Sequence, residues 1–333
     1  MPKRVLKKIH HLHPTVRTAG FFLLKILVAV LVILLLIRKI SLERLVHALV
    51  DANAAYITAG VMLLVFNIFL QYKKWQLIVF REAPFVKRRH VLYSLLVGSA
   101  LGLVTPGRLG DFGRTFFIKN VNWAKLLGLL MVDKLITLAV LYFFGIIGLS
   151  HFISMRMHPF VWLPIFIMTI VLVLFFLLFL LRPELLRSIV SRYHSVFSRY
   201  SSLDKIISGV EMATPHFTLQ LLALTALQTL TYCSQFLLFL FAFIEMPILA
   251  AYLSIFAIMF AKSLLPISLG DLGIRESAAV YFLGYFGVPD VAAFNASFLL
   301  FLINILLPSI VGLGLLLFKR QNTLLSNGKN QPD

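Results

Sequence analysis

A short motif that interrupts helices occurs twice inside otherwise apolar sequence. Residues 106–113 read PGRLGDFG, and residues 266–273, 160 positions later, read PISLGDLG. Proline and glycine break a helix, and a broken backbone is stable in a bilayer only where protein or a wet cavity surrounds its unpaired N–H and C=O groups. The repetition therefore indicates an internal duplication, and the two breaks mark a candidate binding site.

The composition defines the class of protein. Hydrophobic residues make up 60% of the 333 residues and charged residues only 13%, so this chain cannot bury its apolar surface in a soluble core. We predict an all-α polytopic integral membrane protein. A single cysteine, Cys233, excludes a disulfide framework and a cysteine-rich metal site. Neither a metal nor a cofactor is expected.

The net charge of +18 reflects membrane topology rather than nucleic-acid binding. The basic residues lie beside apolar runs, where positive charge marks the cytoplasmic side and contacts anionic lipid headgroups. One group precedes the first run and another follows the second: Lys3, Arg4, Lys7, Lys8 and Arg17, then Lys73, Lys74, Arg81, Lys87, Arg88 and Arg89. We interpret both groups as flanks of membrane spans; a specific lipid site is the alternative.

The apolar runs predict about six full spans and two broken hairpins, since a bilayer needs roughly 20 apolar residues per helix. Segments 92–105 and 109–120 are each too short, so we predict a re-entrant hairpin broken at Pro106. Residues 248–288 predict a second such hairpin. The full spans are expected at 20–37, 54–72, 126–150, 159–181, 216–244 and 291–318.

Basic-residue counting orients these spans. With a basic cytoplasmic N-terminus at 1–19, the loops at 38–53, 151–158 and 245–247 fall outside and carry few Lys and Arg residues. An odd number of full spans then separates the two hairpins, so they enter from opposite faces. Such inverted repeats are the architecture of alternating-access transporters.

The domain organisation follows from this topology. A single membrane domain covers 20–318, with repeat 1 at about 54–150 and repeat 2 at about 216–318. Between them, residues 182–214 have apolar residues at helical spacing with arginines interspersed, which predicts a cytoplasmic amphipathic connector on the membrane surface. Residues 319–333 are expected to form a disordered tail, and both termini to be cytoplasmic.

Charged residues in or beside the membrane segments are the candidate functional groups. Each costs about 3 kcal/mol if central and unpaired, so they must pair or face water. Arginine beside a helix N-terminus suits a phosphate, whereas Asp111 and Asp271 have an alternative role as caps of the second hairpin arms. The predicted substrate-binding residues are Arg108, Asp111, Arg114, Asp271, Arg275 and Glu276; Asp133, Lys134 and Lys262 are further membrane charges. The predicted backbone breaks are Pro106, Gly107, Gly110, Pro266, Gly270 and Gly273.

These motifs resemble the paired signature of the lysylphosphatidylglycerol synthase transmembrane-region family. The resemblance lies in Pro106-Gly107-Arg108-Leu109-Gly110-Asp111 followed by Arg114, and in Gly270-Asp271-Leu272-Gly273-Ile274-Arg275-Glu276. This family includes the flippase-like membrane domain of multiple peptide resistance factors. The resemblance extends from about residue 20 to 318 and implies a lipid-translocating domain with inverted halves. Asp271 replaces a common Gly, which shifts the emphasis to Arg275 and Glu276.

Three functional classes are compatible with these features. We expect a flippase of the plasma or inner membrane for a phosphate-bearing lipid, such as a phospholipid, an aminoacyl-phosphatidylglycerol or a polyprenyl phosphate. The alternatives are a lipid-headgroup enzyme with Asp111, Asp271 or Glu276 as base, and a non-catalytic partner of a lipid-modifying enzyme or glycosyltransferase. The sequence has no P-loop and no paired-histidine motif, and it lacks the soluble aminoacyl-transfer domain of the synthases, so we expect no enzymatic activity. The headgroup, the energy coupling and the oligomeric state are left open.

Overall fold

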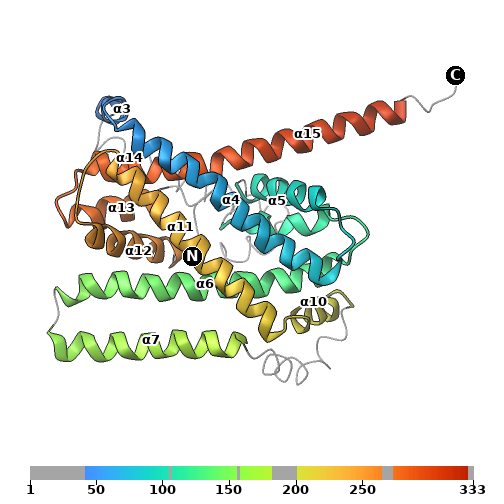
Figure 1. Ribbon diagram of the computed structural model, residues 1–333, viewed down its shortest axis with the longest axis horizontal. Helices are drawn as coiled ribbons and strands as arrows, with labels where there is room; N and C mark the ends of the chain where they lie inside the picture. The colour runs from blue at the N-terminus through green and yellow to red at the C-terminus, as the bar shows by residue number, and fades with distance from the viewer. Residues whose placement is uncertain are drawn as a thin grey trace, which may run out of the picture.

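The computed structural model describes residues 42–103, 105, 107–155, 158–181, 201–264 and 273–328, and every regular element in these ranges is a helix. Figure 1 shows their arrangement. The elements are α3 (Leu42–Val50), α4 (Ala54–Glu82), α5 (Arg88–Leu103), η1 (Leu109–Phe117), α6 (Trp123–Ser154), α7 (Pro159–Leu181), α10 (Ser201–Glu211), α11 (Pro215–Phe241), α12 (Ile248–Leu264), α13 (Ile274–Gly284), α14 (Asp290–Phe301), η2 (Leu302–Leu306) and α15 (Leu307–Gly328). The all-α fold class is thus confirmed. The span expected at 20–37 lies outside the described residues.

Four helical stretches are long and apolar enough to cross a membrane: α4, α6, α11 and the run Asp290–Phe318. Three of them begin with a capped first turn, because the side chains of Asn53, Asn122 and Thr214 each accept a hydrogen bond from a backbone N–H at the start of the helix. Helix α7 has the bounds predicted for the span at 159–181. The chain is therefore a multi-pass membrane protein.

Helices α4 and α11 run antiparallel and pack against each other (Figure 1). At one end, the Asn53 N–H donates to the Ala242 carbonyl oxygen at 2.8 Å. At the other end, Arg81 Nε donates to the Met212 carbonyl oxygen at 3.0 Å. These two bonds join the start of each helix to the end of the other. The pair forms the centre of the bundle.

Each half of the chain packs one hairpin arm on the last helix of the other half. Helix α12 lies along α6, and α15 lies along α5. Both contacts depend on a glycine: a Cβ at Gly148 would clash with the Leu253 carbonyl oxygen, and one at Gly312 with the Leu96 carbonyl oxygen. Small residues at such crossings let helices approach closely in lipid, where packing drives association. The two halves therefore pack directly on each other at these crossings.

Helix α5 ends at Leu103, and the element that follows, where the second arm of the first hairpin was expected, is not an α-helix. After α5 the chain turns through Gly107 and Arg108, whose φ angles are 58° and 56°, into the 3₁₀-helix η1. The Gly110 N–H donates to Thr105 Oγ1 at 2.6 Å and closes the turn. The glycines of this motif lower the helix propensity, and short 3₁₀ segments are common at such connections.

The last span differs from the single helix expected at 291–318. A π-helical segment, η2, separates α14 from α15, and such segments occur often at functional sites. Helix α15 continues past residue 318 to Gly328, where a disordered tail was expected, because no proline or glycine lies between Gly314 and Gly328. Residues 329–333 lie outside the described residues.

The connector is helical in its described part. Helix α10 packs on α6, and Gly128 and Gly209 allow the contact: a Cβ at Gly209 would clash with the Lys125 carbonyl oxygen, and one at Gly128 with the Ile206 carbonyl oxygen. Residues 182–200, which carry most of the predicted amphipathic pattern, lie outside the described residues. This part of the connector is thus anchored to the first half.

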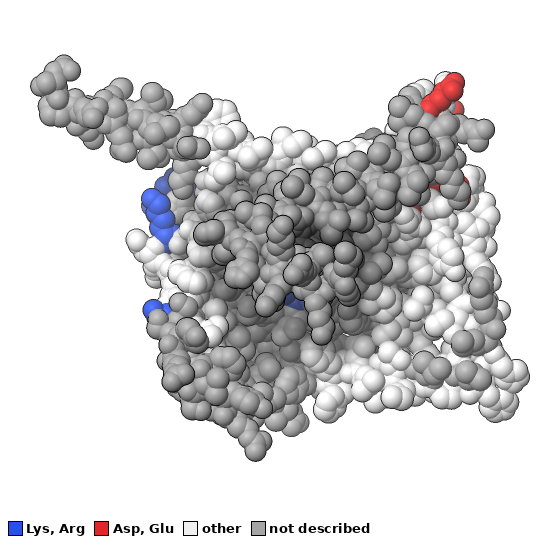
Figure 2. Space-filling model, turned by 180° about the vertical axis from the view of Figure 1, so that it is seen from behind, with Lys and Arg blue, Asp and Glu red and all other residues white. Residues whose placement is uncertain are grey.

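Charge is distributed unevenly between the two ends of the bundle. In Figure 2, Lys and Arg side chains lie along one edge of the face shown, and Asp and Glu lie at the opposite corner. Exposed Lys87, Arg88 and Arg89 follow the end of α4, whereas exposed Glu43 and Asp51 precede its start. Helix α4 therefore runs from an acidic end to a basic end.

Candidate functional site

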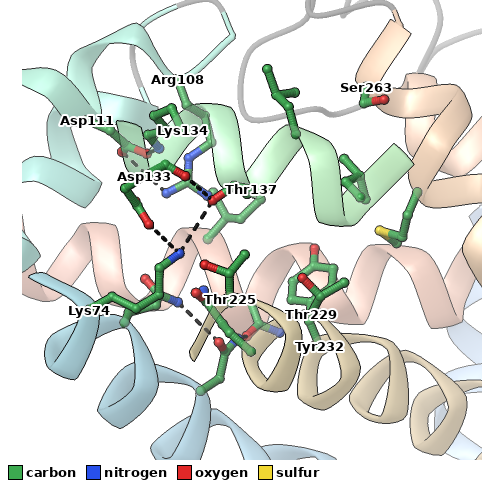
Figure 3. Close-up of a pocket in the computed structure, with 18 of the residues that line it drawn as sticks. Lys74, Arg108, Asp111, Asp133, Lys134, Thr137, Thr225, Thr229, Tyr232 and Ser263 are labelled. Carbon is green, nitrogen blue, oxygen red and sulfur yellow. Dashed lines mark hydrogen bonds and ion pairs between the residues drawn. The ribbon is translucent and has the colours of Figure 1, made fainter. Parts of the chain in front are cut away.

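A cavity of about 360 Å³ lies between the two halves of the chain. Its walls come from α4, the turn before η1, η1 itself, α6, α11, the end of α12 and η2. Figure 3 shows Lys74, Arg108, Asp111, Asp133 and Lys134 on one side and Thr225, Thr229 and Tyr232 of α11 on the other. The cavity thus combines charged groups of the first half with neutral polar groups and one cation, Lys262, of the second.

The described lining residues carry an excess of positive charge. Five are cationic and two are anionic: Lys74, Arg108, Arg114, Lys134 and Lys262 against Asp111 and Asp133. Buried ionisable groups in membrane helices are costly and usually mark a substrate or ion pathway. The excess favours an anionic ligand.

One ion pair is deeply buried in the wall of the cavity. Lys74 Nζ lies 2.8 Å from Asp133 Oδ1, and the side chains are only 8% and 6% exposed (Figure 3). Lys74 Nζ also donates to Thr137 Oγ1 at 3.4 Å. Each charge compensates the other, so neither is left alone in a medium of low polarity.

The interpretation of Lys74 as a cytoplasmic flank is wrong. Helix α4 continues to Glu82, beyond the span end predicted at residue 72, and this places Lys74 inside the bundle. Asn67, Gln71 and Lys74 recur at positions i, i+4 and i+7, so they form one polar face of an otherwise apolar helix. That periodicity was the signal that sequence reasoning missed.

Asp111 lies between two cations at the edge of the cavity. Its Oδ1 is 3.4 Å from Arg108 Nη2, and its Oδ2 is 3.3 Å from Lys134 Nζ. Gly102 of α5 makes room for the carboxylate, because a Cβ there would clash with Oδ1. Asp111 does not cap η1, because the N-cap residue of η1 is Arg108, whose side chain makes no capping hydrogen bond.

Arg114 lines the cavity in a different way. Its guanidinium carbon lies 4.2 Å from the ring centroid of Trp75, and the residue is 9% exposed. Trp75 is held in turn by a hydrogen bond of 2.8 Å from Nε1 to Ser94 Oγ. Gly98 faces the Arg114 Cβ and leaves space for it. Among the described residues, Arg114 Nε has no hydrogen-bond partner.

Arg275 and Glu276 do not line the cavity. Both are fully buried in the second half, with Arg275 Nη2 and Glu276 Oε1 2.7 Å apart. Ser297 Oγ accepts from Arg275 Nε at 2.9 Å and donates to Glu276 Oε1 at 3.0 Å. The Gly273 N–H donates to Glu276 Oε2 at 2.7 Å, so Glu276 caps its own helix, α13. Arg275 Nη1 donates at 3.2 Å to the hydroxyl of Tyr232, which is a residue of the cavity wall.

The structure describes only some of the residues that were predicted to break the backbone. Gly107 lines the cavity, Gly110 packs against the Leu101 carbonyl, and Gly273 precedes α13 with a φ of 88°. The remaining predicted site and break residues lie outside the described residues: Pro106, Pro266, Gly270 and Asp271.

The wall opposite the charged groups was also missed by sequence reasoning. Thr225, Gln228, Thr229 and Tyr232 recur on one face of α11 and line the cavity. The spacing i, i+3, i+4 and i+7 could have identified them. Among the described residues, no three His, Cys, Asp or Glu side chains form a group that could hold a metal ion.

The fold and the cavity define a polytopic helical membrane protein with a charged internal site between two halves. The family model for the lysylphosphatidylglycerol synthase TM region matches residues 22–312, and the chain belongs to this family. The match supports a membrane domain related to lipid handling. No curated protein and no solved structure matches the chain.

Proposed function

We propose that the protein moves a phosphate-bearing lipid between the leaflets of the plasma or inner membrane. The observation that carries this proposal is the cationic cavity between the two halves of the bundle. Guanidinium and ammonium groups bind phosphate oxygens through charge-assisted hydrogen bonds. A site of this kind, built from both halves, can hold a headgroup while the acyl tails stay in the bilayer.

We propose that the two halves are inverted repeats, and this arrangement supports a transport mechanism. Helix α11 begins 161 positions after α4, at residue 215 against 54, and α12 begins 160 positions after α5, at residue 248 against 88. The antiparallel packing of α4 and α11 then means that the two hairpins start from opposite ends of the bundle. Transporters of alternating access use this arrangement around a central site.

The charge distribution supports a cytoplasmic location for the end that carries the α4–α5 turn, because cytoplasmic flanks are rich in Lys and Arg. Both termini are then cytoplasmic as well. Labelling with a membrane-impermeant thiol reagent tests this orientation. Met155→Cys should react in intact cells and Lys87→Cys only after permeabilisation. The native Cys233 is fully buried and gives little background. Equal accessibility at both positions would refute the orientation.

An enzymatic role has less support from the geometry. A general base needs a carboxylate that can take up a proton, and Asp111 and Asp133 both lie in ion pairs with lysines. Glu276 is bound to Arg275 and to the backbone of its own helix. We therefore propose transport and not headgroup chemistry.

Leaflet-resolved measurement in proteoliposomes tests the function. Purified protein should accelerate the exchange of an acyl-chain-labelled phosphatidic acid and phosphatidylglycerol between leaflets, relative to vesicles without protein. Lys134→Gln removes one cavity cation and should slow the exchange, whereas Lys73→Gln, on the exposed side of α4, should not. Conversion of the lipid to a new compound would indicate an enzyme. If the protein causes neither exchange nor conversion of the lipid, a role as a non-catalytic partner is indicated.

A further inference from the structure

We propose that the cavity selects a headgroup with at least two negative charges, a terminal phosphate monoester or a diphosphate, over phosphodiester and aminoacylated headgroups. This inference rests on the proposed function, because it assumes that the cavity holds the headgroup of a lipid. It names the substrate class of that site.

The charge balance is the first argument. Five cations and two carboxylates line the described cavity, which leaves an excess of three positive charges. Asp271 lies outside the described residues, and adding its carboxylate would still leave an excess of two. A phosphodiester carries one negative charge and compensates only part of this excess. A phosphate monoester near neutral pH carries nearly two, and a diphosphate carries more.

The state of the carboxylates is the second argument. A lysyl or other cationic headgroup needs an acid with which to pair. Asp133 is held at 2.8 Å by Lys74, and Asp111 is held by Arg108 and Lys134. A cationic headgroup would have to displace a protein cation from one of these pairs. It would also enter a cavity that already has excess positive charge.

Unpartnered buried groups are the third argument. Arg114 Nε on η1 and Thr225 Oγ1 on α11 are buried, line the cavity and have no hydrogen-bond partner among the described residues. Buried polar atoms are normally bonded, so each exception leaves a cavity-wall atom that a group of a bound headgroup can engage. Trp75 and Gly98 fix the position of Arg114. A terminal phosphate offers three oxygens to such donors, whereas a phosphodiester has only two that are not esterified.

Lipid-binding competition in nanodiscs tests the selection. The probes are phosphatidic acid, phosphatidylglycerol and lysyl-phosphatidylglycerol with identical acyl chains. Phosphatidic acid should bind about tenfold more tightly than phosphatidylglycerol, because it adds charge-assisted hydrogen bonds, and the lysyl lipid should bind most weakly. Equal or tighter binding of phosphatidylglycerol or of the lysyl lipid would overturn the inference.

Three further probes distinguish the possible sources of the phosphate. A polyprenyl phosphate and a polyprenyl diphosphate carry the same head chemistry on a single chain, and soluble pyrophosphate carries it without a lipid. If pyrophosphate competes as well as the lipids, the site recognises the headgroup alone. If only the diacyl lipids or only the polyprenyl lipids compete, the tail identifies the source of the phosphate. Among the lipids that share this tail, the headgroup with the higher negative charge must still bind more tightly. Equal binding of these lipids would contradict the inference.

The pH dependence provides an independent check. The second ionisation of a phosphate monoester lies at about pH 6, and below it the monoester carries one charge, as phosphatidylglycerol does. The preference for phosphatidic acid should therefore narrow between about pH 8 and pH 5, with phosphatidylglycerol measured at each pH as the reference. A preference that is unchanged over this range would show that charge is not what the site selects.

Matched variants assign the selection to the cavity. Arg114→Gln should reduce the preference for phosphatidic acid by about fivefold or more, Arg114→Lys by less, and Lys73→Gln not at all. If none of the cavity variants changes the preference, the inference is wrong. Selective binding without exchange in proteoliposomes would keep the inference and refute transport. Exchange of all lipids without preference would keep transport and refute the inference.

Discussion

The two copies of the duplicated motif place their charges in opposite situations. In the first copy, Arg108, Asp111 and Arg114 line the cavity, and Arg114 Nε has no partner among the described residues. In the second copy, Arg275 and Glu276 are fully buried and bonded to each other and to Ser297. Similar sequence elements therefore serve different purposes. The first copy places its charges on the cavity wall, and the second uses charge to hold its own backbone in place.

This contrast separates stability from recognition. A buried pair whose donors and acceptors are all engaged has little left to offer to a substrate, but its loss leaves an uncompensated charge. A cavity-wall cation such as Arg114, whose Nε has no hydrogen-bond partner among the described residues, contributes less to folding and more to ligand binding. Variants in the two hairpins should therefore differ in what they impair.

The largest effect is expected in the second hairpin. Arg275→Met leaves the Glu276 carboxylate buried without its cation, which should cost about 3–5 kcal/mol of stability. The double variant Arg275→Met with Glu276→Gln should recover part of the loss. Thermal unfolding in detergent measures both. A melting temperature near that of the wild type for Arg275→Met would break the comparison, because Arg275 would then not be a structural residue.

The next effect concerns two neighbouring lysines on α4. Lys74→Gln leaves Asp133 unpaired in the wall of the cavity and should cost about 3 kcal/mol. Lys73→Gln should change stability by about 0.5 kcal/mol or less, since Lys73 is exposed. Unfolding of the two variants under the same conditions gives a matched pair. Equal losses would mean that Lys74 does not act through Asp133.

A smaller effect on stability, but a clear one on transport, is expected at Arg114. Arg114→Gln removes the guanidinium from the Trp75 ring and should reduce leaflet exchange of a phosphate lipid about tenfold, which corresponds to about 1.4 kcal/mol. The melting temperature should change little. The comparison between the hairpins fails if this variant unfolds as readily as Arg275→Met, or if its exchange rate equals that of the wild type.

The smallest effect is expected at the end of α13. Gly284 is helical, and a Cβ there meets no atom within 4 Å, so Gly284→Ala should stabilise the protein by about 0.5–1 kcal/mol. Exchange activity should not change, because Gly284 does not line the cavity. A loss of transport in this stabilised variant would show that the second hairpin must stay flexible, and would make the contrast less sharp.

Much of the fold could be predicted from sequence because local signals were strong. The length of the apolar runs identified α6, α7 and α11, and the motif from Pro106 to Asp111 identified the break between α5 and η1. The end of α4 was predicted too early, because Lys73 and Lys74 form a basic pair after an apolar run. Only the helical period of Asn67, Gln71 and Lys74 separates the buried lysine from its exposed neighbour.

The candidate site could be predicted only in part because the roles of its residues depend on distant contacts. Arg108, Asp111 and Arg114 share one short segment, so their joint position at a backbone break followed from local sequence. Arg275 is buried through bonds to Ser297 and Tyr232, which lie 22 and 43 positions away. No local pattern distinguishes a guanidinium that faces a cavity from one that faces the interior.

A chain of amide hydrogen bonds crosses the centre of the bundle and limits how the two halves can move. Asn67 Nδ2 donates to Asn304 Oδ1 at 2.7 Å, Asn304 Nδ2 to Gln235 Oε1 at 2.9 Å, and Gln235 Nε2 to the Gly60 carbonyl oxygen at 2.8 Å. These bonds join α4, α11 and the π-helical segment η2.

Sliding α4 along α11 by one helical turn would break the bonds of this chain together and leave several amides unsatisfied in an apolar interior. A tilt about the same point would keep them. The amide hydrogen bonds therefore permit a tilt of α4 against α11 and oppose a slide. In such a tilt the ends of the two helices move apart while their centres stay in register.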